Sequence, residues 1–227
     1  MKHAVQLAVE EAAARRKTAG SGVGGVLFAL IALLFLVMAV VQNPELPGGE
    51  QAAGTLDMIA ANPGAAMMTP YLDLAYSVVV ALAFFFAARR LEGRGAGAAA
   101  VGAAIAVAGN MAHSAVAFLE YIVVTMAGLP EQREAMIALW TKWESGPFLI
   151  PFLLLIVSYL VGIIVFAVGL YRAGKLPLWG IIAVIAIAIA KDVAKMPDAL
   201  SDVTGAAVFA LLAWGALRSG TVAERAA

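Results

Sequence analysis

The stretch that decides the fold runs from Gly95 to Gly128 and reads GAGAAAVGAAIAVAGNMAHSAVAFLEYIVVTMAG. It is apolar enough to lie in lipid, and it is longer than the roughly 20 residues that cross the hydrocarbon of a bilayer. On a helical wheel its polar residues fall within about 120° of one another, and small residues lie on the same side. The residues on this face are Asn110, His113, Ser114 and Glu120, with Ala99, Gly102, Ala103, Ala106, Ala117 and Tyr121. Because polar side chains avoid lipid and small residues permit close helix contact, we expect this face to look toward other helices or a wet cavity.

The composition of the whole chain agrees with a membrane protein. Of its 227 residues, 63% are hydrophobic and 13% are charged, whereas about a quarter of a soluble domain is charged. The formal net charge is zero, so nothing favours nucleic acid as a partner. Cysteine is absent, which excludes disulfides, zinc-thiolate sites, iron–sulfur clusters and thiol nucleophiles.

Working outward from the central stretch, the sequence predicts an all-α fold, a polytopic membrane bundle of six transmembrane helices. The expected spans are Val23–Val41, Tyr71–Ala88, Gly95–Gly128, Phe148–Leu170, Leu178–Ala190 and Thr204–Leu217. We expect a loop at 42–69 and a short outer interfacial helix at 129–146, in which Trp140 and Trp143 act as interfacial anchors. Residues 1–20 then form a leader on the lipid headgroups, 21–218 the transmembrane domain and 219–227 a tail.

The distribution of Lys and Arg predicts the orientation of this bundle. If the amino terminus is cytoplasmic, the cytoplasmic segments hold eleven of the 15 Lys and Arg residues, and four remain outside. Cytoplasmic loops carry such an excess of positive charge, so both termini are predicted to be cytoplasmic. The eleven are Lys2, Arg15, Arg16, Lys17, Arg89, Arg90, Arg94, Arg172, Lys175, Arg218 and Arg225.

Most of the candidate site residues fall in the outer half of this predicted bundle. The last two spans are too short to cross a bilayer unless the charged hairpin Lys191–Asp202 folds toward the membrane. Together with the polar positions of the second and third spans, this predicts a polar vestibule open to the outside and closed within. The candidate binding or proton-relay residues are Asp73, Tyr76, Asn110, His113, Glu120, Lys191, Asp192, Lys195, Asp198 and Asp202.

Three classes of function remain open for such a protein. The first is transport or ligand binding linked to a small solute, a proton or a cation, since intramembrane ionisable residues mark such sites. The second is an accessory or assembly subunit of a larger membrane complex, or a homo-oligomer. The third is an intramembrane enzyme at the outer leaflet, although H-E-x-x-H, G-x-S-x-G and S-x-x-K are all absent. The polar residues also have a purely structural interpretation, in which Glu120 pairs with Lys191 or Lys195 and His113 bonds Asn110 or a tyrosine.

No cofactor or metal is expected. His113 is the single histidine within a predicted span, because the other histidine, His3, lies in the leader. A multi-histidine metal centre or a bis-histidine haem therefore cannot be built from one chain. The one partner that the composition itself requires is the lipid bilayer.

Two phrases of the sequence resemble uncharacterised bacterial integral membrane proteins with six helices. One is the basic, glycine-containing start of the first span, RRKTAGSGVGGVLFAL, and the other is GLYRAGKLPLWGIIAVIA around the end of the fourth span. The resemblance implies a multi-pass protein of the bacterial inner, or cytoplasmic, membrane. That family has no assigned activity, so the resemblance implies no catalytic residues.

Overall fold

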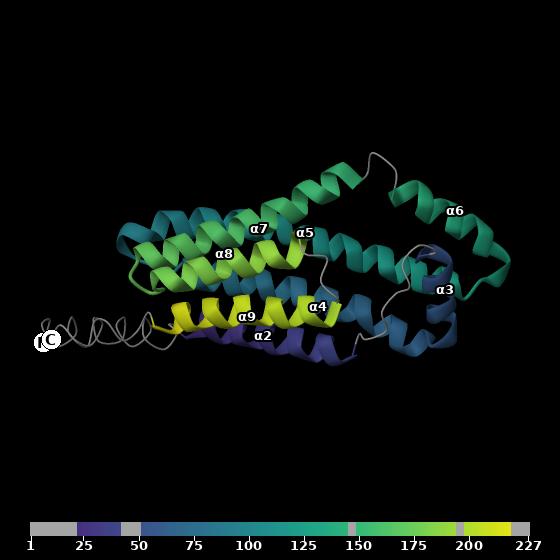
Figure 1. Ribbon diagram of the computed structural model, residues 1–227, viewed down its shortest axis with the longest axis horizontal. Helices are drawn as coiled ribbons and strands as arrows, with labels where there is room; N and C mark the ends of the chain where they lie inside the picture. Colours follow the sequence, from purple (N-terminus) through teal and green to yellow (C-terminus); the bar gives the residue numbers. More distant parts are fainter. Residues whose placement is uncertain (1–21, 42–50, 145–148, 194–197, 219–227) are drawn as a thin grey trace, which may run out of the picture.

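The computed structural model describes residues 22–41, 51–144, 149–193 and 198–218, and within these ranges all regular structure is helical. The predicted all-α fold is therefore confirmed, while the predicted leader and tail lie outside the described residues. Two shorter helices, α3 (Gln51–Ala61) and α6 (Arg133–Glu144), lie at one end of the molecule (Figure 1). The six long helices are α2 (Val23–Val41), α4 (Pro63–Ala88), α5 (Ala96–Ala127), α7 (Leu149–Arg172), α8 (Leu178–Val193) and α9 (Asp198–Leu217).

The six long helices form a ring in the order of the sequence. Each packs against the next along the chain, from α2 to α4, α5, α7, α8 and α9, and α9 closes the ring by packing along α2. Two of the connections, from α4 to α5 and from α7 to α8, are only a few residues long, so each of these pairs must lie antiparallel. The turn between α7 and α8 is an example, since Gly174 ends α7 with a φ of +70°, which favours glycine.

Helix α5 is held against α7 by small residues that allow the two backbones to touch. A Cβ atom added at Gly169 of α7 would lie 2.5 Å from the backbone nitrogen of Ala99. One added at Gly102 would meet the backbone of Phe166 even more closely, and one at Gly162 the backbone of Ala106. Close approach of this kind gives van der Waals contact along this stretch of the two helices, and such contact is a main attraction between helices in lipid.

The predicted inward face of α5 is buried over most of its length. Ala99, Gly102, Ala103, Ala106, Asn110 and Ala117 are all buried. Tyr121 was expected on the same face but is 44% exposed, so that part of the prediction is wrong. The reason is that α5 and α7 diverge toward this end of the molecule (Figure 1), which leaves the face uncovered there.

Helices occupy more of the chain than the hydropathy pattern predicts. Most of the segment 42–69, expected as a loop, is helical, because α3 covers Gln51–Ala61 and α4 begins at Pro63. Proline interrupts a helix interior but suits the first turn, where its missing N–H is not needed. Similarly, α9 begins at Asp198 rather than Thr204, because charged side chains end a hydropathy window without interrupting helical hydrogen bonds. The two ends of the predicted hairpin, at Lys191 and at Asp198–Asp202, are therefore helical.

The outside of the ring is apolar. Large hydrophobic side chains face outward all around it, among them Leu30, Leu33, Val78, Phe85, Phe118, Leu154 and Ile182. Soluble monomers rarely expose contiguous apolar surface on this scale. Within the described residues, two helical segments are long and apolar enough to cross a membrane, namely Ala66–Ala88 and Leu200–Leu217.

The two ends of the ring differ in charge. The end where α4, α7 and α9 terminate, here called the basic end, holds six of the described basic residues: Arg89, Arg90, Arg94, Arg172, Lys175 and Arg218. At the opposite end, Arg133 of α6 contacts Asp57 of α3 through two N···O pairs of 2.5 and 3.1 Å. Both residues are well exposed, so this ion pair positions α3 against α6 more than it stabilises the fold.

Candidate functional site

A pair of tyrosines lies inside the ring at mid-height. The hydroxyl groups of Tyr76 on α4 and Tyr159 on α7 are 2.6 Å apart. Tyr76 is only 2% exposed, and its ring meets the edges or faces of Phe35 from α2 and Phe209 from α9 at centroid distances of 5.2 and 6.3 Å. Four helices of the ring therefore converge on one hydroxyl pair, which gives the bundle a polar centre.

Two carboxylates lie near this centre. Asp73 precedes Tyr76 by three residues on α4, which places both on one side of that helix. Asp202 comes from the first turns of α9. The charges of both carboxylates act on the Tyr76 hydroxyl. The structure thus brings together Asp73, Tyr76 and Asp202, three residues that the sequence predicted as parts of one site.

A second polar contact joins α4 to α5 beside the tyrosines. The side-chain Nδ2 of Asn110 donates a hydrogen bond of 2.8 Å to the backbone carbonyl of Ser77. Both residues are 3% exposed. The Oγ of Ser77 and the Oδ1 of Asn110 have no hydrogen-bond partner among the described residues. Asn110, another predicted site residue, therefore takes part in the same polar centre from a third helix. We call Asp73, Tyr76, Ser77, Asn110, Tyr159 and Asp202 the polar core.

Aromatic side chains close the polar core toward the basic end. The ring of Phe28 lies 5.1, 5.8 and 6.0 Å from those of Phe84, Phe166 and Phe209, so α2, α4, α7 and α9 each contribute one ring. We call these four residues the phenylalanine plug. Along α4, every residue from Val78 to Ala88 is apolar.

The remaining predicted site residues cannot be joined to the polar core. The backbones of His113 and Glu120 lie in α5, those of Lys191 and Asp192 in the last turn of α8, and that of Asp198 at the start of α9. Their side chains, and all of Lys195, lie outside the described residues. Within the part of the chain that is described, no group of three or more His, Cys, Asp or Glu residues is arranged to hold a metal ion.

Sequence reasoning missed two residues of the polar core. Neither Ser77 nor Tyr159 is among the candidate residues that the sequence predicts. The signal was present for Tyr159, because it lies in the middle of a helix whose neighbours are almost all apolar. What the pattern lacked was the partner, which lies 83 residues earlier in the chain.

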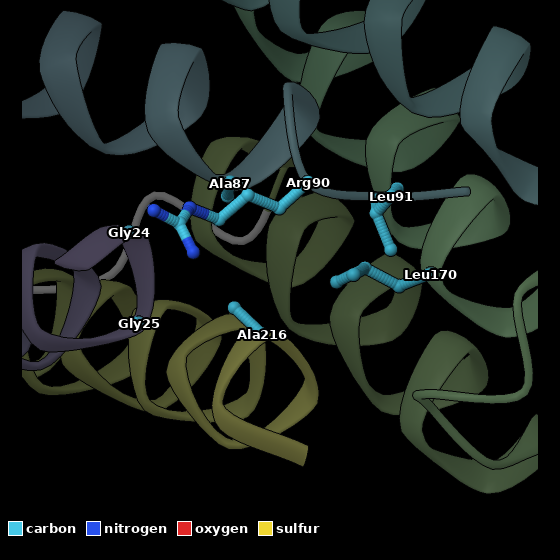
Figure 2. A pocket seen from close by; sticks show the side chains of 7 residues that line it. All are labelled: Gly24, Gly25, Ala87, Arg90, Leu91, Leu170 and Ala216. Carbon is cyan, nitrogen blue, oxygen red and sulfur yellow. The ribbon is translucent and has the colours of Figure 1, made fainter. Parts of the chain in front are cut away.

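The basic end carries a small cavity of its own. Its volume of about 10 Å³ has room for roughly one water molecule. Figure 2 shows the side chain of Arg90, just beyond the end of α4, reaching across it toward Gly24 and Gly25 of α2.

On the same end, the guanidinium of Arg218 lies 4.0 Å from the ring centroid of Trp214, which in turn packs on the exposed Trp179. These contacts provide amphipathic anchors of the kind found where lipid meets water.

Comparisons with protein-family models, with curated proteins and with solved structures found no match to this chain. The function therefore has to be inferred from the geometry of the polar core and the arrangement of charge around the ring.

Proposed function

We propose that this protein is a multi-pass protein of the bacterial inner membrane whose six long helices all span the bilayer, with both termini in the cytoplasm. Three observations support this arrangement. The outside of the ring is apolar, six described basic residues gather at one end, and the exposed Trp179 lies at that same end. Positive charge marks the cytoplasmic side of membrane proteins, and tryptophan marks the interface. The basic end is then cytoplasmic, and α3 and α6 lie outside.

We propose further that the polar core is a binding site reached from the outer side, for a small solute or for a proton or cation whose binding is linked to transport. The observation that carries this proposal is the convergence of Asp73, Tyr76, Tyr159 and Asp202 from three helices in the interior of an apolar ring. Polar and ionisable groups are costly inside a bilayer, and those that persist there usually serve binding or proton transfer.

The phenylalanine plug bears on whether the site only binds a ligand or also transports it. Because it fills the ring below the polar core, it favours a site that binds from one side over an open path through the membrane. Transport would require the rings of Phe28, Phe84, Phe166 and Phe209 to separate, so that access alternates between the two sides.

A second candidate function is that of an accessory subunit of a larger membrane complex, or of a homo-oligomer. One observation favours it. Ala100, Ala104 and Ala108 form an exposed row on α5, at a spacing of four residues and facing away from the ring. Rows of small residues allow the close approach of another helix in lipid.

Ligand-dependent unfolding of the purified full-length protein tests the binding proposal. A ligand that binds the folded state raises its unfolding temperature by mass action. We would measure that temperature in detergent across pH 5 to 9, with sodium, potassium or choline as the cation, and with a panel of small neutral and charged solutes. We expect at least one condition to raise it, and expect Asp202→Asn and Tyr76→Phe to remove that increase.

The matched control is Asp57→Asn, which removes an exposed carboxylate at the outer end but leaves the polar core intact. It should keep the full ligand response. If no condition stabilises the wild type more than it stabilises Asp202→Asn, the polar core is not a binding site. Co-purification of one protein in fixed ratio from native membranes would then favour the subunit role.

A further inference from the structure

The contact between Asn110 and Ser77 leaves two buried polar atoms without a hydrogen-bond partner among the described residues, one that requires a donor and one that can donate. Asn110 uses its Nδ2 group on the Ser77 carbonyl, which fixes the orientation of the amide because the reverse orientation would set two oxygens against each other. Its Oδ1 atom then has no donor among the described residues. The hydroxyl of Ser77 can donate a proton but has no acceptor among the described residues. Both side chains are 3% exposed, so bulk water does not reach them.

Leaving both atoms unpaired is unfavourable. A buried polar group without a partner typically destabilises a protein by roughly 1–3 kcal/mol, and native structures contain few such groups. The ligand that resolves this must accept a hydrogen bond from Ser77 and donate one to Asn110. A carboxylate or phosphate is excluded, because it has no proton to give to Oδ1. A hydroxyl oxygen meets both needs, and water is its smallest form.

We propose that one water molecule is bound between the Oγ of Ser77 and the Oδ1 of Asn110. Buried waters of this kind usually make about three hydrogen bonds to groups that the protein cannot satisfy itself. The direct hydrogen bond from Asn110 to the Ser77 carbonyl is one polar link between α4 and α5. The water would add a second link between the same two residues. Ser77 is followed on α4 by apolar residues alone as far as Ala88, so this water forms the inner limit of the polar core.

This inference is independent of the proposed binding function, because it follows from the needs of two atoms rather than from any ligand of the polar core. It can be tested by NMR on the full-length protein in detergent micelles. The chain has three asparagines, at positions 43, 62 and 110, so labelling with ¹⁵N-asparagine gives three side-chain amides. Asn110→Leu identifies the amide of interest by removing one of the three signals.

We expect a cross-peak between the Asn110 side-chain amide and a long-lived water. The Ser77→Ala variant removes the hydroxyl but keeps the carbonyl to which Asn110 is bonded, so the amide signal should stay in place while its water cross-peak is lost. The matched control is Ser158→Ala. That hydroxyl bonds the carbonyl of Leu154 on its own helix, so its removal should leave the cross-peak unchanged.

Two results would overturn the proposal. One is the lack of a water cross-peak in the wild type, together with a shift of the Asn110 amide on His113→Ala, which would mean that a protein side chain fills the place. The other is a cross-peak that keeps its intensity in Ser77→Ala, which would place the water elsewhere.

Discussion

The hydroxyl groups of Tyr76 and Tyr159 lie 2.6 Å apart inside the ring, although 83 residues separate them in the chain. Burying a hydroxyl group without a hydrogen-bond partner is unfavourable, and the hydrogen bond between these two groups offsets part of that cost. The pair connects α4 and α7, which are not consecutive in the ring because α5 lies between them. It therefore joins two helices that are not neighbours in the ring.

This pairing predicts strong coupling between the two tyrosines. Tyr76→Phe or Tyr159→Phe should each lower the free energy of unfolding by roughly 0.5–1.5 kcal/mol, because each removes the hydrogen bond between the two hydroxyl groups. The double variant should lose less than the sum of the two, with a coupling of roughly 1 kcal/mol. Denaturant unfolding in detergent measures all four proteins. Tyr171→Phe is the control, since that side chain is 42% exposed, and additive losses for the buried pair would contradict the prediction.

The contact between α5 and α7 predicts opposite effects for two glycines on one helix. Gly102→Ala should destabilise the protein by roughly 1–3 kcal/mol, because the new methyl group would overlap the backbone of Phe166. Gly97→Ala should be neutral or stabilising by about 0.5–1 kcal/mol, because nothing lies within 4 Å of its Cβ position and alanine favours a helix. Thermal unfolding of the two variants checks this. Equal tolerance of both would mean that α5 and α7 do not touch at this point.

The proposed orientation predicts which positions can be labelled from outside the cell. Because the protein has no cysteine, single cysteines can be introduced without a background. Glu134→Cys in α6 should react with an impermeant maleimide in intact cells, whereas Glu92→Cys at the basic end should react only after the cells are opened. Labelling in the reverse pattern would invert the topology. Labelling of both positions in intact cells would mean that the ring does not separate the two sides.

The charged residues outside the polar core lead to a prediction that rests on the sequence. If Glu120 is paired with Lys191 or Lys195, Glu120→Gln should destabilise the protein by leaving a lysine unpaired, an effect that can reach several kcal/mol for a buried pair. Adding the correct Lys→Met substitution should then restore much of the loss.

A proton site at Glu120 predicts a different result. Glu120→Gln should then leave stability unchanged or raise it, because a neutral amide replaces a desolvated carboxylate, and it should abolish any response to pH. Unfolding measured across pH for the single and double variants separates the two cases. Additive effects with both lysines, and an unchanged response to pH, would make Glu120 a solvated residue with neither role.

By itself the sequence determined the local features of this protein. The start and end of α2 are those that its apolar run predicts, and the turn between α7 and α8 falls between the predicted spans Phe148–Leu170 and Leu178–Ala190. The buried face of α5 was also predicted as far as Ala117, because helical periodicity and the placement of small residues are properties of a single segment. Asp73 and Tyr76 could be grouped for the same reason, since they lie on one helix.

Only the tertiary structure decided what these faces meet. That Gly102 lies against Phe166, that Tyr76 finds Tyr159, and that Asn110 reaches the carbonyl of Ser77 all depend on which helices are neighbours in the ring. Tyr121 illustrates what the sequence of one helix cannot determine. It lies on the expected side of α5, but it is exposed because α7 diverges from α5 at that end. Neighbours are chosen by the fit between whole helix surfaces, and that fit sums many weak contacts between residues far apart in the chain.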